Sequence, residues 1–301
     1  LELLGDGETG KPHTAYELNR SAEFRAAVEQ ALSGIHNQHT LETESKYYHI
    51  ISNPVTEKGH VTAAVIIVMD ATEKESRDKL RREFTSNVSH ELKTPLTTIY
   101  GVSDMMAEGI VRASDVEGFA KSIRDESKRM ISLIDDIIKL SKLDENSFAD
   151  ESSPVDLLET AKDVIERLSM KAKENNVTLL LDGEHTWISG IPALCSEIIY
   201  NLCENAIKYN KENGSVVVSV KNAHDGGGTL TVEDTGIGIP FEYRDRIFER
   251  FFRVDKSRSR QTEGTGLGLS IVKHAVVHMG GRIDVESVEG KGTKMTVSFF
   301  K

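Results

Sequence analysis

The feature that most restricts the fold is a pair of apolar stripes, each with the spacing of an amphipathic helix. Their members are Leu80, Phe84, Val88, Leu92, Leu96, Ile99 and Met106, then Val116, Phe119, Ile123, Met130, Leu133, Ile137 and Leu140. A short polar turn after Gly109 separates them. Two such helices form an antiparallel hairpin, and since two helices alone bury their stripes poorly, a second hairpin should complete a four-helix bundle. The chain is therefore predicted to be a homodimer.

The residues before this hairpin have a mixed pattern. A helical period at 24–32 is followed by strand-like runs at 46–51 and 61–69. Turn signals lie between the two runs, Asn-Pro at 53–54 and Lys-Gly at 58–59. Because the second run is β-branched and almost continuous, we expect a well-buried strand there.

After a polar linker at 144–154, helices and strands alternate to the end of the chain. Helices are expected near 155–175, 192–210, 241–250 and 267–280, and strands near 177–181, 186–189, 215–221, 229–234, 282–287 and 293–300. This alternation predicts an α/β layer domain with a mixed sheet. The predicted class is α+β multidomain, with an α/β domain at 1–71, a helical hairpin at 72–147 and an α/β sandwich at 148–301.

The charge balance bears on possible partners. The 301 residues hold 48 acidic and 37 basic side chains, a formal net charge of −11. A chain this acidic repels phosphate backbones, so nucleic acid is not expected as a direct partner.

Cys195 and Cys203 have no metal-ligand spacing and are expected to be buried thiols. No apolar stretch approaches the roughly 20 residues of a membrane-spanning helix.

An exposed imidazole is expected in the first helix of the hairpin. His90 lies two positions after Val88, about 160° around the helix from the apolar stripe. An exposed imidazole is largely uncharged near neutral pH and keeps a free lone pair, as a phosphoryl acceptor requires. Glu91 can reach the other ring nitrogen, and Thr94, one turn along, can position a water.

The helix near 192–210 carries polar side chains on one face. Asn201, Asn205 and Lys208 share that face, and Tyr209 follows directly. Asn205 offers an amide oxygen to Mg²⁺, Lys208 a charge to phosphates and Tyr209 a ring beside a base. Asparagines on a helix are usually solvated, so this helix indicates a nucleotide site only together with the loops that follow.

Two glycine-rich loops lie downstream. Asp234 ends a strand and can accept a hydrogen bond from a purine amino group, while Gly236 and Gly238 let a ligand approach the backbone. The run Gly264-Thr265-Gly266-Leu267-Gly268 leads into a helix, whose first amides suit phosphates. Its spacing, with no strand directly before it and no Walker lysine after it, excludes the Rossmann and P-loop folds.

A basic segment lies between the two loops, in an otherwise acidic chain. Arg253 follows Phe251 and Phe252, and three further cations lie within 254–263. We predict that this segment is a lid over a triphosphate, anchored by the two phenylalanines. An ordinary solvated loop is the alternative.

Taken in order, these pieces resemble the motifs of sensor histidine kinases. The octet 89–96 is similar to the H-box, and the helix with Asn205 to the N box. The Asp234 loop, the segment 248–253 and the run 264–268 resemble the G1, F and G2 boxes. The resemblance implies a HisKA-type dimerisation domain followed by an ATP-binding domain with the Bergerat fold.

The resemblance also implies a function. The protein would use ATP and Mg²⁺ to phosphorylate its own His90, with Glu91 and Thr94 assisting, and pass the group to an aspartate of a response regulator receiver domain. A phosphatase activity on the phosphorylated regulator is expected too. Asn205 would ligate Mg²⁺, and Asp234 would bind the adenine amino group. The nucleotide site would comprise Asn201, Asn205, Lys208, Tyr209, Asp234, Gly236, Gly238, Arg253, Gly264, Gly266, Leu267 and Gly268.

Residues 1–71 resemble the latter half of a PAS sensor domain from phosphate-responsive membrane kinases, and the residues Asp70-Ala71-Thr72-Glu73 are similar to the motif that ends such domains. A purely structural PAS domain without a ligand is the alternative to a ligand-binding one. Since the chain starts at Leu1, we expect a cytoplasmic fragment of a bacterial protein that is anchored in the membrane upstream.

Two other classes of protein share parts of the pattern. A chaperone or mismatch-repair ATPase of the same nucleotide-binding superfamily would explain the glycine loops, but not an exposed His90 on a bundle helix. A pseudokinase scaffold would keep the fold without the catalytic groups, yet all the expected groups are present.

Overall fold

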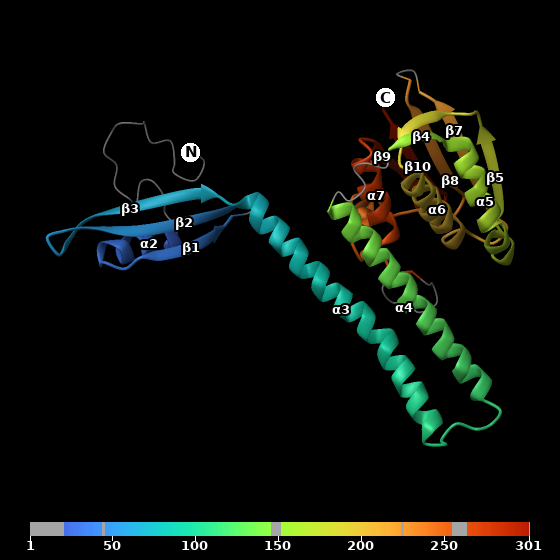
Figure 1. The fold of residues 1–301 in the computed structure, drawn as a ribbon, viewed down its shortest axis with the longest axis horizontal. Coiled ribbons are helices and arrows are strands. Elements are labelled where there is room, and N and C mark those ends of the chain that lie inside the picture. The colour runs from blue at the N-terminus through green and yellow to red at the C-terminus, as the bar shows by residue number, and fades with distance from the viewer. Residues whose placement is uncertain (1–20, 44–45, 146–151, 224–225, 255–263, 301) are drawn as a thin grey trace. The chain divides into compact units, whose positions relative to one another are not determined.

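The computed structural model describes residues 21–43, 46–145, 152–223, 226–254 and 264–300. The chain divides into two compact units, residues 1–86 and 87–301 (Figure 1). In order, its elements are α2 (Ala22–Leu32), β1 (Asn37–Glu42), β2 (Tyr47–Glu57), β3 (His60–Asp70), α3 (Thr72–Ala107), α4 (Val116–Asp144), β4 (Ser153–Asp156), α5 (Leu157–Glu174), β5 (Thr178–Gly183), β6 (Trp187–Gly190), α6 (Pro192–Lys208), β7 (Ser215–Asn222), β8 (Gly228–Asp234), η1 (Phe241–Tyr243), η2 (Arg246–Phe248), α7 (Gly268–His278), β9 (Arg282–Val288) and β10 (Gly292–Phe299). The predicted α+β class is confirmed, while the three predicted domain boundaries stay predictions.

The first unit contains a three-stranded antiparallel sheet in the order β1-β2-β3, with α2 against one face (Figure 1). Helix α2 begins where the hydroxyl of Ser21 accepts a hydrogen bond from the amide of Phe24, at 3.2 Å. Phe24 and Ala27 of α2 pack with Leu41 and Ile50 of the sheet and form a small core. Strand β1, a short polar segment, was not predicted.

The burial of β3 corrects the prediction of a well-buried strand. Val65, Ile67 and Met69 are 46%, 44% and 44% exposed. Side chains alternate between the two faces of a strand, and α2 covers only the face that carries Ile50. The apolar run at 61–69 is therefore only half covered within the described residues.

The hairpin of β2 and β3 corrects one predicted turn and confirms the other. Strand β2 does not stop at Asn53-Pro54 but continues to Glu57. Strand β1 pairs with β2 only as far as Ser52, so the missing amide hydrogen of Pro54 costs no bond to β1. The turn lies at Lys58 and Gly59, whose φ values of 50° and 84° suit a two-residue hairpin.

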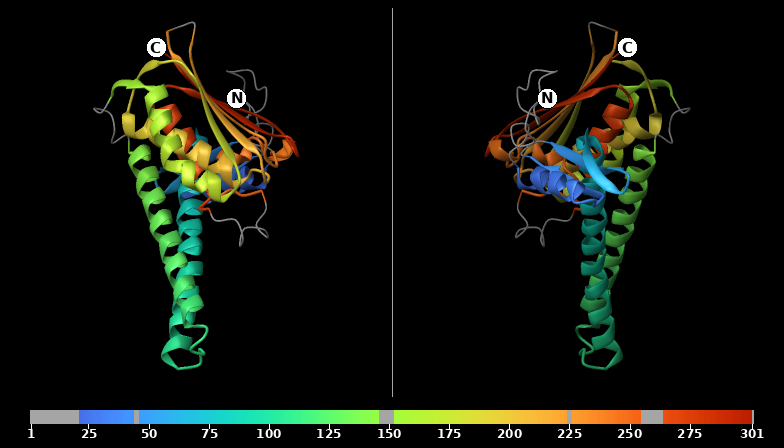
Figure 2. Two further views of the ribbon diagram at one scale, coloured as in Figure 1. Left: turned by 90° about the vertical axis from the view of Figure 1, so that its right-hand side faces the viewer. Right: turned by 90° about the vertical axis from the view of Figure 1, so that its left-hand side faces the viewer.

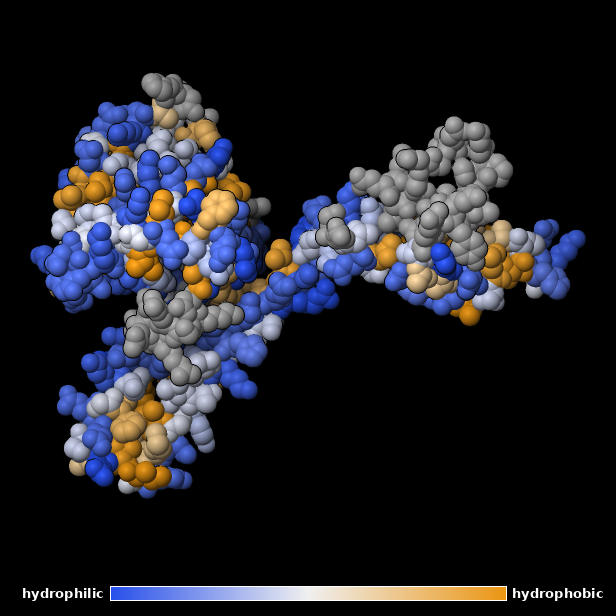
Figure 3. All heavy atoms as spheres, turned by 180° about the vertical axis from the view of Figure 1, so that it is seen from behind, coloured by the Kyte–Doolittle hydropathy of each residue, from blue (hydrophilic) through white to orange (hydrophobic). Residues whose placement is uncertain are grey.

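Helices α3 and α4 form the predicted hairpin, and α3 runs unbroken through Pro95. Val102 of α3 and Leu140 of α4 are buried, whereas Leu96 and Ile131 are 56% and 60% exposed. Apolar side chains also gather at the surface near the tip of the hairpin (Figure 3). One copy of the hairpin thus leaves part of its apolar surface uncovered.

The C-terminal part is a two-layer arrangement of a mixed sheet and three helices. The sheet has the order β5-β7-β8-β10-β9, and β5 and β7 are its parallel pair. Helices α5, α6 and α7 lie on one face of it (Figures 1 and 2). Strands β4 and β6 form a separate two-stranded sheet, and β4 was not predicted because the linker was expected there.

The two cysteines behave as expected. Cys195 and Cys203 lie on α6, and both are buried and free. Burial raises the pKa of each thiol to about 12. They therefore stay protonated and act as small apolar side chains in this helix.

Helix α5 begins at an N-cap made by Asp156. Its carboxylate accepts hydrogen bonds from the amide of Leu158 at 3.0 Å and from the ring of His185 at 2.6 Å. Burial alone would raise the pKa of Asp156, but the bonds from His185 and Leu158 outweigh it and lower that pKa. The hydrogen bond to Asp156 raises the pKa of His185. The pair links α5 to the segment before β6.

Replacing Asp156 by alanine should lower the free energy of unfolding by about 1 kcal/mol through loss of the cap. The effect should be larger at pH 5.5 than at pH 8. Because the pKa of His185 is raised in the folded state, its pair with Asp156 stabilises the fold fully at pH values below the unfolded pKa of about 6.5. This stabilisation is lost as the pH rises through the folded pKa of His185. The lowered pKa of Asp156 contributes stability above about pH 4 that is lost as the pH falls through the folded value.

Denaturant titrations at the two pH values measure this difference. Asp163→Ala, at an exposed position of the same helix, is the matched control. Equal losses in the two variants, or a loss that does not change with pH, would contradict the assignment of the cap.

Candidate functional site

Helix α6 places its first predicted site residue at a junction with α7. Asn201 is 8% exposed, and its amide donates to the carboxylate of Glu197 at 2.8 Å. Lys139 of α4 donates to the same carboxylate, also at 2.8 Å. A Cβ atom on Gly268 would lie 2.7 Å from the side-chain oxygen of Asn201, so this oxygen faces the glycine run. Asn205, one turn further along, is half-buried.

Two cations and an aromatic ring meet at the first glycine of the run. Arg253 donates from Nη1 to the carbonyl of Gly264 at 2.9 Å. A Cβ atom on Gly264 would collide with Nζ of Lys208, which lies 4.8 Å from the centroid of the Tyr209 ring. Burial raises the pKa of Tyr209, and the charge of Arg253 opposes that rise. These four predicted residues are therefore close together.

The carboxylate of Asp234 is held by the backbone. It accepts hydrogen bonds from the amides of Gly236 at 2.8 Å and Thr293 at 3.2 Å. Burial raises the pKa of Asp234, although both amides act to lower it. A Cβ atom on Gly236 would collide with the carbonyl of Tyr209, and Gly238 has a φ of 67°. The loop therefore requires glycine at both positions.

The glycine run is shaped by contact with the F-box segment. Gly266 has a φ of 73°, and its carbonyl accepts a hydrogen bond from the amide of Phe251 at 2.9 Å. Leu267 is completely buried, and its backbone amide donates to the hydroxyl of Thr265 at 3.2 Å. The predicted lid beyond Val254 lies outside the described residues.

Helix α4 also contacts this region, although no motif in the sequence predicted it. The hydroxyl of Thr265, inside the glycine run, donates to Asp136 at 2.8 Å. Burial raises the pKa of Asp136, and the bond from Thr265 opposes it. Arg250 donates to Asp144 at 2.7 Å. These pairs join segments that are 129 and 106 residues apart, and no local pattern in the sequence could reveal them.

His90 is exposed on α3, as predicted. It borders a cavity of about 390 Å³ that is lined by His90, Lys93, Thr94, Thr97 and Thr98. The hydroxyl of Thr94 donates to the backbone carbonyl of His90 at 3.2 Å. The imidazole therefore faces solvent, while the hydroxyl predicted to position a water is held in a bond along its own helix.

Glu91 is turned toward the second helix of the hairpin. Its carboxylate lies 3.5 Å from a guanidinium nitrogen of Arg129 on α4. Its predicted contact with the ring of His90 stays a prediction, and Arg129 was not foreseen. Among the described residues, no hydrogen bond joins His90, Glu91 or Thr94 to the group around Asp234.

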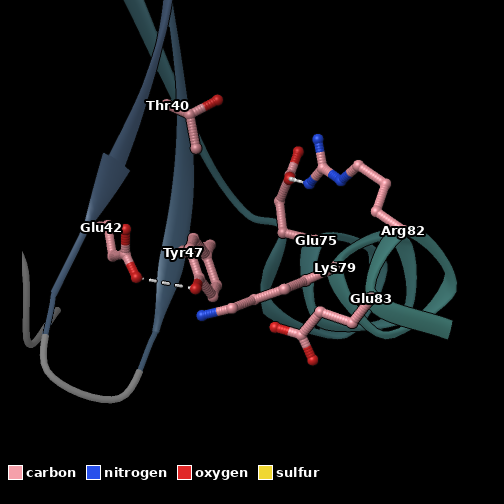
Figure 4. A pocket seen from close by; sticks show the side chains of 7 residues that line it. All are labelled: Thr40, Glu42, Tyr47, Glu75, Lys79, Arg82 and Glu83. Atoms are coloured by element: carbon pink, nitrogen blue, oxygen red, sulfur yellow. Dashed lines mark hydrogen bonds and ion pairs between the residues drawn. The ribbon is translucent and has the colours of Figure 1, made fainter. Parts of the chain in front are cut away.

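The first unit holds a separate polar cavity of about 500 Å³ where the sheet meets α3 (Figure 4). It is lined by Thr40, Glu42, Tyr47, Glu75, Lys79, Arg82 and Glu83. Tyr47 donates to Glu42 at 2.7 Å, and Glu75 lies 4.0 Å from Arg82 and 2.9 Å from the ring of His49. Charges of both signs compensate one another here, so the cavity does not favour one class of ligand.

Two family models match the chain. Residues 190–301 match the histidine kinase-, DNA gyrase B-, and HSP90-like ATPases. Residues 80–146 match the His Kinase A (phospho-acceptor) domain. The first match contains the group around Asp234, and the second contains His90. In the described ranges, every helix is too short or too polar to span a membrane.

Several known proteins are similar to this chain. It is 37% identical over 249 residues to the sensor protein kinase WalK of Staphylococcus haemolyticus (strain JCSC1435), covering 82% of this chain and 41% of the relative. It is 36% identical over 244 residues to the sensor histidine kinase WalK of Bacillus subtilis (strain 168), covering 80% and 40%. The chain thus spans less than half the length of these relatives.

A solved structure shares the fold. Histidine kinase ThkA, in a complex with the response regulator protein TrrA, aligns with a TM-score of 0.56 at 19% identity. The alignment covers 95% of this chain and 85% of that one. Because an ATPase domain of the histidine kinase type follows a phospho-acceptor domain in one chain, this protein belongs to the sensor histidine kinases.

Proposed function

We propose that this protein uses ATP to phosphorylate His90 and then passes the phosphoryl group to an aspartate in the receiver domain of a response regulator. The observation that carries the proposal is an exposed imidazole on a hairpin that precedes an ATPase-type domain. A chaperone-like or repair ATPase would have no use for such a hairpin.

The proposed reaction is an in-line phosphoryl transfer. A lone pair of one His90 ring nitrogen attacks the γ-phosphorus, an N–P bond forms, and the bond from that phosphorus to the bridging oxygen breaks. ADP leaves with the electron pair. The proton on the other ring nitrogen passes to Glu91. Positioning and charge compensation supply most of the catalysis in reactions of this type.

The group around Asp234 would hold the nucleotide. Asp234 would accept a hydrogen bond from the adenine amino group, and Tyr209 would flank the base. Lys208 and Arg253, which meet at Gly264, would contact the phosphates. The backbone of Gly266 and Gly268 would approach the phosphate oxygens closely, and the amide of Leu267 could join them only by leaving the hydroxyl of Thr265.

The residues at the phosphate end also fit Mg²⁺, which prefers oxygen ligands. The side-chain oxygen of Asn201 faces Gly268, and Asn205 offers an amide oxygen one turn along the same helix. We assign Asn205 as the residue that would hold the ion. When bound, Mg²⁺ neutralises part of the phosphate charge.

The uncovered apolar side chains of the hairpin support a homodimer. Leu96 and Tyr100 of α3 and Ile131, Ile134 and Ile138 of α4 are all at least 42% exposed. The α4 residues follow one another at spacings of three and four, which forms a continuous stripe. A second hairpin would bury this stripe in a four-helix bundle.

A phosphatase activity toward the regulator would use Thr94. Its hydroxyl would have to leave the carbonyl of His90 before it could orient a water.

The membrane anchor expected upstream remains part of the proposal for the whole protein.

The first test is labelling with γ-labelled ATP and Mg²⁺. The chain should acquire label that is stable to alkali and lost in acid, and His90→Gln should remove all of it, because no other residue is proposed to accept the group. His60→Gln, another exposed histidine, is the control and should label normally. ATP hydrolysis without label would favour a repair or chaperone ATPase, and no nucleotide binding would favour a pseudokinase.

The second test concerns Asp234. Asp234→Asn should weaken binding of adenine nucleotide about 10- to 100-fold, since a hydrogen bond to a charged group is worth about 1.5–3 kcal/mol. Because burial raises the pKa of Asp234, binding should weaken as the pH falls, at a higher pH than for an exposed aspartate. Calorimetric titrations at several pH values measure both effects. Glu233→Gln, the exposed neighbour, is the control, and an equal loss in both variants would contradict the role of Asp234.

A further inference from the structure

Arg129 lies between two carboxylates at the level of His90. Its guanidinium is 3.5 Å from Oε2 of Glu91 on α3 and 4.0 Å from Oε2 of Glu126, one turn earlier on α4. The three side chains are only 28% to 39% exposed. In the described part of the chain, Oε2 of Glu126 is buried and has no hydrogen-bond partner. The charge of Arg129 is therefore the nearest compensation for that carboxylate.

We propose that Arg129 is a positioning residue for the phosphorylation of His90, acting through Glu91. This inference rests on the proposed function. Neighbouring side chains on a helix point about 100° apart, so Glu91 does not face His90 merely because it follows it. Arg129 fixes Oε2 of Glu91 at the edge of the hairpin seam. The other carboxylate oxygen then remains available to accept the ring proton of His90.

Charge explains why a cation is needed to hold Glu91 in place. Glu91 and Glu126 both lie within 4.0 Å of Arg129, and their like charges repel each other more strongly where water is partly excluded. A guanidinium has five N–H donors in a fixed plane, so it can serve both carboxylates at once. Arg129 thus compensates the acidic pair while it orients one member of it.

A purely structural role makes a different prediction. An ion pair that only joins α3 to α4 would contribute about 0–1 kcal/mol to stability and nothing specific to the rate of phosphorylation. The two roles separate when the rate, the KM for ATP and the stability are measured on the same variants. Arg124, on the same helix and 60% exposed, offers a matched control of the same residue type.

The experiment is autophosphorylation of the full chain with γ-labelled ATP, at several ATP concentrations, with dimer content and melting temperature measured for each variant. Arg129→Gln should slow labelling about 10- to 100-fold at saturating ATP, as expected when a catalytic group is misplaced. The KM for ATP should not change. Arg129→Lys should restore part of the rate, and Arg124→Gln should label like the unmodified chain.

The decisive comparison is the double variant. If Arg129 acts through Glu91, Arg129→Gln combined with Glu91→Gln should label no more slowly than Glu91→Gln alone. If the double variant is slowed by the product of the two single reductions in labelling rate, the proposal is overturned while the function stands. The same holds if Arg129→Gln labels as fast as Arg124→Gln. If Arg129→Gln does not fold, Arg129→Lys with and without Glu91→Gln gives the same comparison. An unmodified chain that acquires no label at His90 would overturn both the function and this role.

Discussion

The burial of one face of α3 against α4 decides where each chemical group near the phospho-acceptor points. Pro95 and Val102 are the buried residues of α3. His90 is five residues before Pro95, about 140° around the helix, and so it faces water. Glu91 is four residues before Pro95 and shares its side of the helix, which brings it toward Arg129. The same packing thus exposes the nucleophile and turns its neighbour toward α4.

A second constraint acts in the ATPase domain, where three separate segments must approach closely. The end of α6, the loop after β8 and the start of α7 meet around Asp234, Lys208 and Gly264. Backbone amides hold the carboxylate of Asp234, and Gly236 fits only because it has no side chain. The backbone itself therefore supplies the contacts that hold this carboxylate.

Periodicity and turn chemistry predicted much of this structure from the sequence. The hairpin of α3 and α4, helix α6 and the mixed sheet all follow from spacing, and each predicted site residue that lies in the ATPase domain comes from a local motif. Strands β1 and β4 were missed because they are short and polar. The half-exposed face of β3 could not be foreseen, because burial depends on how many layers cover a sheet. The pairs of Glu91 with Arg129 and Asp136 with Thr265 depend on tertiary packing alone.

The bond between Thr265 and Asp136 has a thermodynamic consequence. It ties the hydroxyl of Thr265, in the glycine run, to Asp136 of helix α4, and the same run is proposed to bind phosphates. If nucleotide weakens this bond by some factor, then breaking the bond must strengthen nucleotide binding by the same factor, because linkage between two equilibria is reciprocal. The conformation of the hairpin and the binding of nucleotide would then be coupled through the carboxylate of Asp136.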